Sequence, residues 1–346
     1  MESLLIYGAY GYTGERIART AVDRGHTPVL AGRNPDRLHS LAGDLGVRSR
    51  AFGVDDDIET QLDGIETVLN CAGPFESTAD QFVEACLNRG VDYLDITGEL
   101  PVFERLARRD EEARAAETTL LPGVGFDVVP TDCLAAHLTT RLDEPTHLSI
   151  AISADGSLSG GTLKTLINGL GSGGVVRTDG HLRAVPTGSN VRVVDFGAGN
   201  RTVLSVPLGD LTTAFRSTGV PNITTYVAVP DGAVHAVRLG RPLKRLASTD
   251  PGKRLLTKLV DRFVDGPTDA ERADAETIIW AEAWSETTGK TVESTLRTPD
   301  PYDVTVEAAL AAAENVVDVD SGFQTPATAF GPEFAVELPG VSRKDR

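Results

Sequence analysis

The chain has 346 residues, 40% of them hydrophobic, and a formal net charge of −17 at pH 7. Its length suits two domains, or one domain with a large insertion. The acidic charge repels phosphate backbones and so argues against DNA or RNA as partners. No apolar run could cross a bilayer and no signal peptide is recognisable, so we expect no integral membrane association and a cytoplasmic location.

The acidic residues are spread along the chain, lysine is scarce beside arginine, and aspartate outnumbers glutamate. Such a surface stays solvated in concentrated salt, which screens its self-repulsion. We therefore predict a salt-adapted, halophilic source, with an ordinary acidic bacterial protein as the alternative. The three cysteines show neither a CxxC motif nor metal-ligand spacing, so we expect buried thiols and no metal site.

A glycine-rich turn near the N-terminus is the first functional motif. The apolar run Leu4–Ile6 predicts a buried strand, and an amphipathic helix follows the turn directly. A strand, a glycine turn and a helix N-terminus together form a pyrophosphate site, because exposed N–H groups and the helix dipole favour negative charge. A tight turn without a ligand is the alternative. The turn residues that we assign to the cofactor are Gly8, Tyr10, Gly11, Tyr12, Thr13 and Gly14.

The second predicted strand, Pro28–Ala31, is followed by Gly32, Arg33 and Asn34. NAD sites carry an acidic residue here, which receives the ribose hydroxyls. Arginine suits a 2′-phosphate instead, so we predict NADP (NADPH) rather than NAD, with a solvated turn arginine as the alternative. Asn34, also a candidate cofactor contact, is expected to cap a helix over residues 35–45.

The next two strands supply further candidate contacts. A short strand around residues 50–54 leads to Asp55, which could meet the adenine amine or cap the following helix. The strand Thr67–Cys71 is broken by Ala72, Gly73, Pro74 and Phe75. This loop leaves the carboxyl end of a central strand, where doubly wound sheets bind ligands, so we expect it near the nicotinamide ribose.

Strands and helices continue to alternate through residues 78–142, which predicts a parallel sheet with right-handed crossovers. We expect helices over residues 78–89, 101–117 and 133–142, and strands at Tyr93–Ile96 and from Leu120. Asp132, in the loop after the last strand, could face the ligand or cap the helix over residues 133–142.

The candidate catalytic residues are three acids near the expected nicotinamide: Asp95, Glu99 and Asp127. A partly buried carboxyl group there could donate a proton, but each could equally be structural. The chain has no Tyr-x-x-x-Lys pair and no G-x-S-x-G elbow, which argues against a short-chain dehydrogenase and a hydrolase. What remains is hydride transfer, in which the cofactor carries the difficult step.

Several motifs in order resemble the saccharopine dehydrogenase-like family. They are GAYGYTG, AGRN, NCAGPF, ACLNRGVDYLDITGE, PGVGFDVVPTDC, SGGTLKTLI and GFQTPATAFG. The chain is most similar to the shorter members, the trans-acting enoyl reductases and the saccharopine dehydrogenase-like oxidoreductases. The resemblance implies a Rossmann domain, an inserted α+β domain and a pyridine nucleotide, usually NADP. By position it also implies cofactor contacts at Gly8, Gly11, Gly14, Arg33 and residues 72–75.

The pattern changes near residue 146, where apolar and polar residues begin to alternate. We predict a Rossmann domain over residues 1–145, completed by 303–346, and an inserted α+β domain over 146–302 with a mostly antiparallel sheet. This sheet covers the cofactor or pairs with a second subunit, so the sequence is compatible with a homodimer. A helix opened by Gly160, Gly161 and Thr162 could present N–H groups to a ligand or start with an ordinary cap.

Together these features predict an NADP-dependent oxidoreductase that transfers hydride to or from a carbonyl, imine or enoyl group of a small or lipid-like substrate. The candidate substrate contacts are Phe126, Asp127, Gly160, Gly161 and Thr162. A non-catalytic sensor of NADP(H), or a partner subunit of another enzyme, is the alternative.

Overall fold

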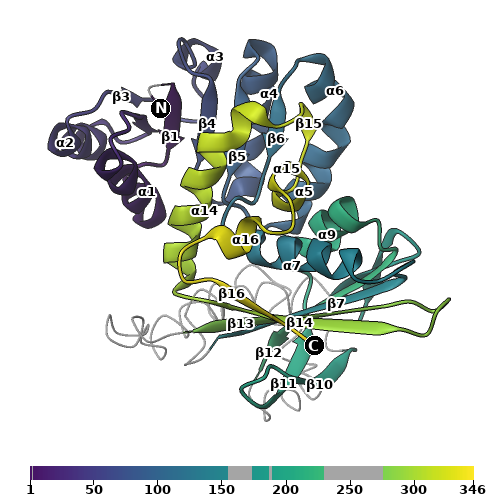
Figure 1. Ribbon diagram of the computed structural model, residues 1–346. Helices are drawn as coiled ribbons and strands as arrows, with labels where there is room; N and C mark the ends of the chain where they lie inside the picture. The colour runs from purple at the N-terminus through teal and green to yellow at the C-terminus, as the bar shows by residue number, and fades with distance from the viewer. Residues whose placement is uncertain (2, 155–173, 187–188, 230–275) are drawn as a thin grey trace, which may run out of the picture. The chain divides into compact units, whose positions relative to one another are not determined.

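The computed structural model describes residues 1, 3–154, 174–186, 189–229 and 276–346. The chain divides into two compact units (Figure 1). The first comprises Met1–Cys133 and Pro301–Pro339, and the second comprises Leu134–Asp300 and Gly340–Arg346. The sequence places the first boundary twelve residues later, at 145/146, and assigns the whole C-terminal segment to the first domain. The final residues instead belong with the second unit because they form one of its strands.

A seven-stranded parallel sheet forms the centre of the first unit, with strand order β15-β6-β5-β4-β1-β2-β3. The chain passes from β1 outward to β3, then crosses to the other side of β1 and continues outward from β4. Ligands bind outside the carboxyl ends of the strands at such a switch point. The strands are β1 Leu4–Tyr7, β2 Val29–Gly32, β3 Ser49–Ala51, β4 Thr67–Asn70, β5 Asp92–Asp95, β6 Thr119–Leu121 and β15 Gly322–Phe323.

Helices lie on both faces of this sheet, as the predicted doubly wound fold requires (Figure 1). Leu5 and Tyr7 face a core that includes Phe82 of α4 and Phe103 of α5, whereas α1 and α14 contact each other. The helices are α1 Tyr12–Asp23, α2 Pro35–Leu45, α3 Ile58–Gln61, η1 Phe75–Ser77, α4 Ala79–Arg89, α5 Leu100–Leu106, η2 Ala107–Arg109, α6 Asp110–Ala115, α14 Pro301–Asn315, η3 Val316–Asp318, α15 Pro326–Phe330 and α16 Phe334–Glu337.

Two elements of the first unit differ from the sequence prediction. The strand β3 ends at Ala51, so it is shorter than the predicted strand over 50–54. The single helix expected over 101–117 is interrupted by η2. The new helix α6 then begins with Asp110, Glu111 and Glu112. Three acids in a first turn favour a helix N-terminus at that position, because they complement the positive end of the helix dipole.

The second unit contains a nine-stranded sheet, with main order β10-β11-β12-β7-β13-β14-β16 and with β8 and β9 attached through β12. Its pairs are antiparallel except for β12 with β7, so the predicted mostly antiparallel sheet is confirmed. The elements are α7 Val129–Thr140, which crosses the boundary between units, β7 His147–Ala154, β8 Gly174–Thr178, β9 His181–Val185, β10 Val191–Asp195, β11 Asn200–Ser205, α9 Asp210–Thr218, β12 Asn222–Ala228, β13 Thr277–Trp284, β14 Thr291–Thr298 and β16 Ser342–Asp345.

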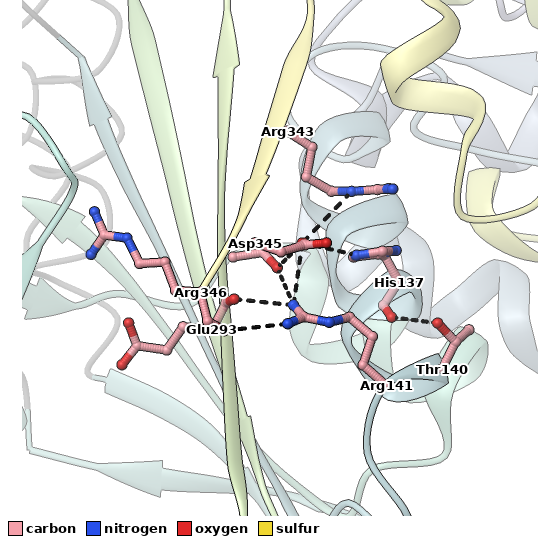
Figure 2. Close-up of polar contacts among 8 residues, drawn as sticks. His137, Thr140, Arg141, Glu293, Arg343, Asp345 and Arg346 are labelled. Carbon is pink, nitrogen blue, oxygen red and sulfur yellow. Dashed lines mark hydrogen bonds and ion pairs between the residues drawn. The ribbon is translucent and has the colours of Figure 1, made fainter.

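A polar cluster joins the end of α7 to β14 and β16 in the second unit (Figure 2). Asp345 lies at its centre and accepts from Ser294 Oγ at 2.6 Å. Its carboxylate also lies 3.0 Å from His137 Nε2 and 3.2 Å from Arg141 Nη1. Arg141 in turn donates to the backbone carbonyl of Arg346. The cluster therefore ties β16, which the sequence did not predict, to α7.

No helix in the described ranges is both long enough and apolar enough to span a bilayer.

Candidate functional site

The glycine turn between β1 and α1 is too crowded for larger residues. A Cβ at Gly14 would lie 2.4 Å from the carbonyl oxygen of Gly8, and one at Gly11 would lie 3.1 Å from the same oxygen. Gly8 adopts φ +78°, and a Cβ there would lie 3.0 Å from Ala72. Its N–H donates to the carbonyl of Ala31 at 2.9 Å, which ties the turn to β2. The three glycines therefore let the turn, α1 and the loop after β4 approach closely.

The N-terminus of α1 is suited to an anionic ligand. Its N-cap is Gly11, which is exposed, and no side chain caps the helix. Uncapped N–H groups at a helix start, together with the helix dipole, attract phosphate. Tyr12 follows the cap and is 56% exposed, and its ring meets Tyr302 of α14 edge-on at 4.8 Å. The predicted turn residues thus surround the start of α1.

Two arginines stand at the end of β2. Arg33 is exposed and makes no hydrogen bond or ion pair within the described ranges of the chain. Arg37, one helical turn further on, lies over the Tyr10 ring at 4.7 Å and donates to the Tyr10 carbonyl at 2.9 Å. Two guanidinium groups at this position suit a phosphate group. Sequence reasoning missed Arg37, although its place in the first turn of the helix predicted over 35–45, close after Arg33, could have found it.

Tyr10 is held across the end of β2. A Cβ at Gly32 would lie 2.6 Å from the Tyr10 ring, and the Tyr10 hydroxyl accepts from the N–H of Asn34 at 3.1 Å. Asn34 caps α2 as predicted, because its Oδ1 accepts from the N–H of Arg37 at 3.0 Å. A side chain at position 32 would therefore collide with the Tyr10 ring in this position.

Asp55 does not cap the helix that follows it. The N-cap of α3 is Asp57, whose side chain accepts from the N–H of Thr60 at 3.4 Å. Asp55 itself is exposed between β3 and α3. The capping alternative for Asp55 is therefore wrong, because the helix starts two residues later than its position requires. Its predicted role at the adenine stays a prediction.

The loop after β4 is fixed at both ends by side chains. The amide of Asn70 accepts from the N–H of Ala72 at 2.9 Å, and the Thr78 hydroxyl donates to the carbonyl of Ala72 at 2.8 Å. The Glu99 carboxylate accepts from the N–H groups of Phe75 at 2.9 Å and Glu76 at 2.7 Å. The tip, Gly73–Pro74, joined by a cis peptide bond, is exposed. The loop predicted to meet the cofactor therefore has a fixed base and an accessible tip.

Asp95 is completely buried at the end of β5. Its Oδ1 accepts from the N–H groups of Thr97 at 2.9 Å and Gly123 at 3.0 Å, and its Oδ2 accepts from the Tyr93 hydroxyl at 2.9 Å. Desolvation raises the pKa of Asp95 to about 6, although these hydrogen bonds oppose the rise. These contacts tie together the ends of β5 and β6, as the structural alternative for Asp95 requires.

Asp127 differs from the other two candidate acids. No hydrogen bond to its carboxylate is found among the described residues, and its side chain is exposed. A Cβ at Gly98 would lie 2.7 Å from this carboxylate, so the acid borders the loop after β5. Desolvation by the surrounding protein raises the pKa of Asp127. The neighbouring Phe126 is buried, and its N–H donates to Thr305 of α14.

Four candidates remain, and of these only Asp132 lies in the described part of the chain. Asp132 is buried and accepts from the N–H of Ala327 at the start of α15. Gly160, Gly161 and Thr162 lie outside the described residues. A shallow groove of about 520 Å³ between α3 and α4 is lined by Asp56, Asp57, Glu59, Asp80 and Glu84, and its acidity makes it unsuitable for a dinucleotide. No cluster of three potential metal ligands is found in the described ranges.

Comparison with known proteins finds a similar domain for the same segment. Residues 4–121 match the family model described as the saccharopine dehydrogenase NADP binding domain. The match ends at the last residue of β6, so it covers the first six strands of the parallel sheet. The prediction of NADP as the cofactor is thereby confirmed at the level of the domain family.

Two curated relatives extend the comparison. The chain is 26% identical over 220 residues to a human protein named saccharopine dehydrogenase-like oxidoreductase, covering 55% of this chain and 50% of that protein. It is 30% identical over 154 residues to the trans-acting enoyl reductase of Mycobacterium ulcerans, covering 41% of this chain and 36% of that protein. The matched regions thus span half or less of these relatives, which are oxidoreductases by name.

The fold itself matches a solved structure along the full chain. Apo saccharopine dehydrogenase (L-Glu forming) from Saccharomyces cerevisiae superposes with a TM-score of 0.67, covering 100% of both chains at 12% sequence identity. At this identity the match concerns the fold alone. It confirms the predicted combination of a Rossmann sheet with a second, mixed-sheet domain.

Proposed function

We propose that this protein is an NADP-dependent oxidoreductase that transfers hydride to or from a carbonyl, imine or enoyl carbon. The observation that carries the proposal is the close-packed glycine turn at an uncapped helix N-terminus, with Arg33 and Arg37 beside it. The turn would hold the pyrophosphate, and the two arginines would hold the 2′-phosphate. The names of the relatives support the reaction class.

The residues present fit a dinucleotide. The turn at Gly8, Gly11 and Gly14 is closely packed, with a Cβ at Gly14 only 2.4 Å from the Gly8 carbonyl oxygen, so the uncapped N–H groups at the start of α1 lie on a backbone that a phosphate could approach. Bound there, NADP supplies the hydride chemistry. The accessible Gly73–Pro74 tip of the loop after β4 would orient the nicotinamide.

The proton that accompanies hydride transfer requires a group with a free oxygen. Both oxygens of Asp95 and both oxygens of Glu99 accept hydrogen bonds, and the Asp95 carboxyl does not reach solvent. Asp127 has an exposed carboxylate without such bonds among the described residues. We therefore assign the proton donor to Asp127, and the substrate contact to Asp127 together with Phe126.

The cofactor assignment is tested by Arg33→Asp. The change removes a charge-assisted contact and adds a repulsive one, so NADPH should bind at least about tenfold more weakly, while NADH binding changes little. Isothermal titration calorimetry with both nucleotides measures this. Arg108→Asp, in the exposed η2 turn, is the matched charge control and should leave both affinities unchanged. Equal losses of NADPH and NADH affinity in Arg33→Asp would remove the phosphate role.

Turnover distinguishes an enzyme from a sensor. The protein would be incubated with NADPH and a panel of carbonyl, imine and enoyl compounds in molar salt, with Asp127→Asn in parallel. Oxidation of NADPH by the wild type and its loss in the variant are expected. Tight NADPH binding without oxidation across the panel would favour the sensor or partner-subunit alternative. The homodimer, the cytoplasmic location and the salt-adapted source stay predictions.

A further inference from the structure

The hydrogen bonds that begin at Asp95 have a fixed direction. An ionised carboxylate can only accept, so the Tyr93 hydroxyl must donate to Asp95 Oδ2. The phenol oxygen is then available as an acceptor, and Asn70 Nδ2 lies 3.3 Å from it. Asp95, Tyr93 and Asn70 are buried, with Asp95 and Asn70 paired in register on neighbouring strands. No water is needed to complete this chain of donors and acceptors.

The orientation of the Asn70 amide follows from its other neighbours. The N–H of Ala72 can only donate, so the group facing it must be Asn70 Oδ1. The amide nitrogen is then directed to Tyr93 and to Thr78 Oγ1, which lies 3.2 Å away. The Thr78 hydroxyl accepts a hydrogen bond from Asn70 and donates one to the carbonyl of Ala72. The hydrogen-bond chain thus starts at Asp95, and both branches that leave the Asn70 amide end on Ala72.

We propose that Asp95 and Tyr93 are positioning residues for the dinucleotide, because they set the direction of the hydrogen-bond chain that orients the backbone of Ala72 at the base of the cofactor loop. Neither residue touches the cofactor. The inference rests on the proposed function, since it assigns to this loop a contact with NADP.

Reversal of this hydrogen-bond chain would disturb the loop after β4. In Asp95→Asn, the amide nitrogen can face Tyr93 as a donor, so the phenol must donate toward Asn70 instead. The Asn70 amide must then turn its oxygen toward Tyr93. Its nitrogen is thereby brought against the N–H of Ala72, which loses its acceptor. The effect is transmitted through Tyr93, so Tyr93→Phe interrupts it without changing charge.

Protonation of Asp95 should have the same effect as the Asp95→Asn substitution. The titratable groups that face it are Tyr93 on β5, Cys71 after β4 and Glu99 at the start of α5. The loops at Thr97 and Gly123 present backbone N–H groups. Burial raises the pKa of Asp95 to about 6, so the direction of the hydrogen-bond chain should reverse within an accessible pH range.

The experiment measures the dissociation constant of NADP⁺ by calorimetry from pH 5 to 8 in the wild type, Asp95→Asn and Tyr93→Phe. At pH 8 both variants should bind about tenfold more weakly, the equivalent of one hydrogen bond. Below about pH 6 the wild type should bind NADP⁺ no more tightly than the variants do, because Asp95 is then protonated. The affinities of the two variants should show no such loss. The 2′-phosphate of the ligand also titrates, but its contribution is common to all three proteins and cancels in the comparison.

Tyr7→Phe is the matched control, because Tyr7 is buried on the same face of the sheet and its hydroxyl donates to Phe52 instead. It should leave the affinity and its pH profile unchanged. Wild-type affinities and parallel pH profiles in Asp95→Asn and Tyr93→Phe would overturn the positioning role. If Asp95→Asn does not fold, Tyr93→Phe decides alone. Failure of the wild type to bind NADP⁺ at any pH would instead overturn the proposed function.

Discussion

The carboxyl edge of the first sheet and the α7–β16 cluster of the second unit use carboxylates in different ways. Asp95 and Glu99 accept from backbone N–H groups and thereby fix the path of three loops. Asp345 is 43% exposed and accepts mainly from the side chains of His137, Arg141 and Ser294. A carboxylate that binds backbone N–H groups fixes the paths of loops, whereas a carboxylate that binds side chains holds two elements together without fixing the backbone of either.

The two kinds of carboxylate also respond oppositely to pH. Burial raises the pKa of Asp95 to about 6, so between its usual value near 3.8 and about 6 the folded state keeps a proton that the unfolded state has lost. This contribution to stability therefore falls as the pH rises through that interval. Hydrogen bonds from Ser294 and His137 lower the pKa of Asp345 despite some desolvation. Its contribution is complete above its usual value and is lost as the pH falls through the lower folded-state pKa.

The largest expected effect on stability comes from a substitution in the closely packed glycine turn between β1 and α1. In Gly14→Ala the new Cβ would lie 2.4 Å from the Gly8 carbonyl oxygen, so we expect a loss of about 3 kcal/mol in unfolding free energy and of NADP binding. Denaturant titration and calorimetry measure the two. Gly43→Ala is the control, since a Cβ there meets no atom within 4 Å in α2. It should stabilise by about 0.5–1 kcal/mol; similar losses in both variants would contradict the packing argument.

A smaller effect is expected when a backbone-bound carboxylate is removed. Glu99→Ala leaves the N–H groups of Phe75 and Glu76 without their acceptor, which should cost about 2 kcal/mol of stability and weaken NADP binding. Glu112→Ala removes an exposed glutamate that pairs with Arg109 and lies in the first turn of α6, and it should change stability by less than about 1 kcal/mol. Urea denaturation compares the two, and equal effects would show that the backbone contacts carry no special weight.

The smallest effect belongs to the α7–β16 cluster. Asp345→Asn should cost less than about 1 kcal/mol at pH 7, because exposed ion pairs are screened by solvent. The difference from the wild type should shrink as the pH falls below about 4 through the lowered pKa of Asp345, and it should also shrink in molar salt. Thermal unfolding at several pH values measures it. The difference between the two proteins is the informative quantity, because Asp95 contributes equally to both. A difference that stays constant as the pH falls from about 4 to about 2 would contradict the ionic account.

Much of the first unit could be predicted because its signals are local. Each predicted strand is a short apolar run followed by a turn, and Gly8, Gly11 and Gly14 act within one stretch of seven residues. Arg33 likewise follows from its position at the end of a strand. These features need no knowledge of distant contacts.

The contacts made by the acids could not be predicted in the same way. Glu99 binds N–H groups 23 and 24 residues earlier in the chain, and Asp95 binds Gly123, so their partners depend on how strands assemble. The strand β16 escaped prediction because its sequence, Ser-Arg-Lys-Asp, shows no apolar alternation. This segment is a strand because its backbone pairs with β14.

Neither unit is a continuous stretch of the chain, since the first needs residues from both before and after the second. During synthesis on the ribosome, β6 and α1 remain without their partners β15 and α14 until the segment Leu134–Asp300 of the second unit has been translated. Fragments that end near residue 133 therefore expose unpaired sheet edge and uncovered helix surface. Chaperone dependence and aggregation of such nascent chains follow from the order in which the polypeptide emerges.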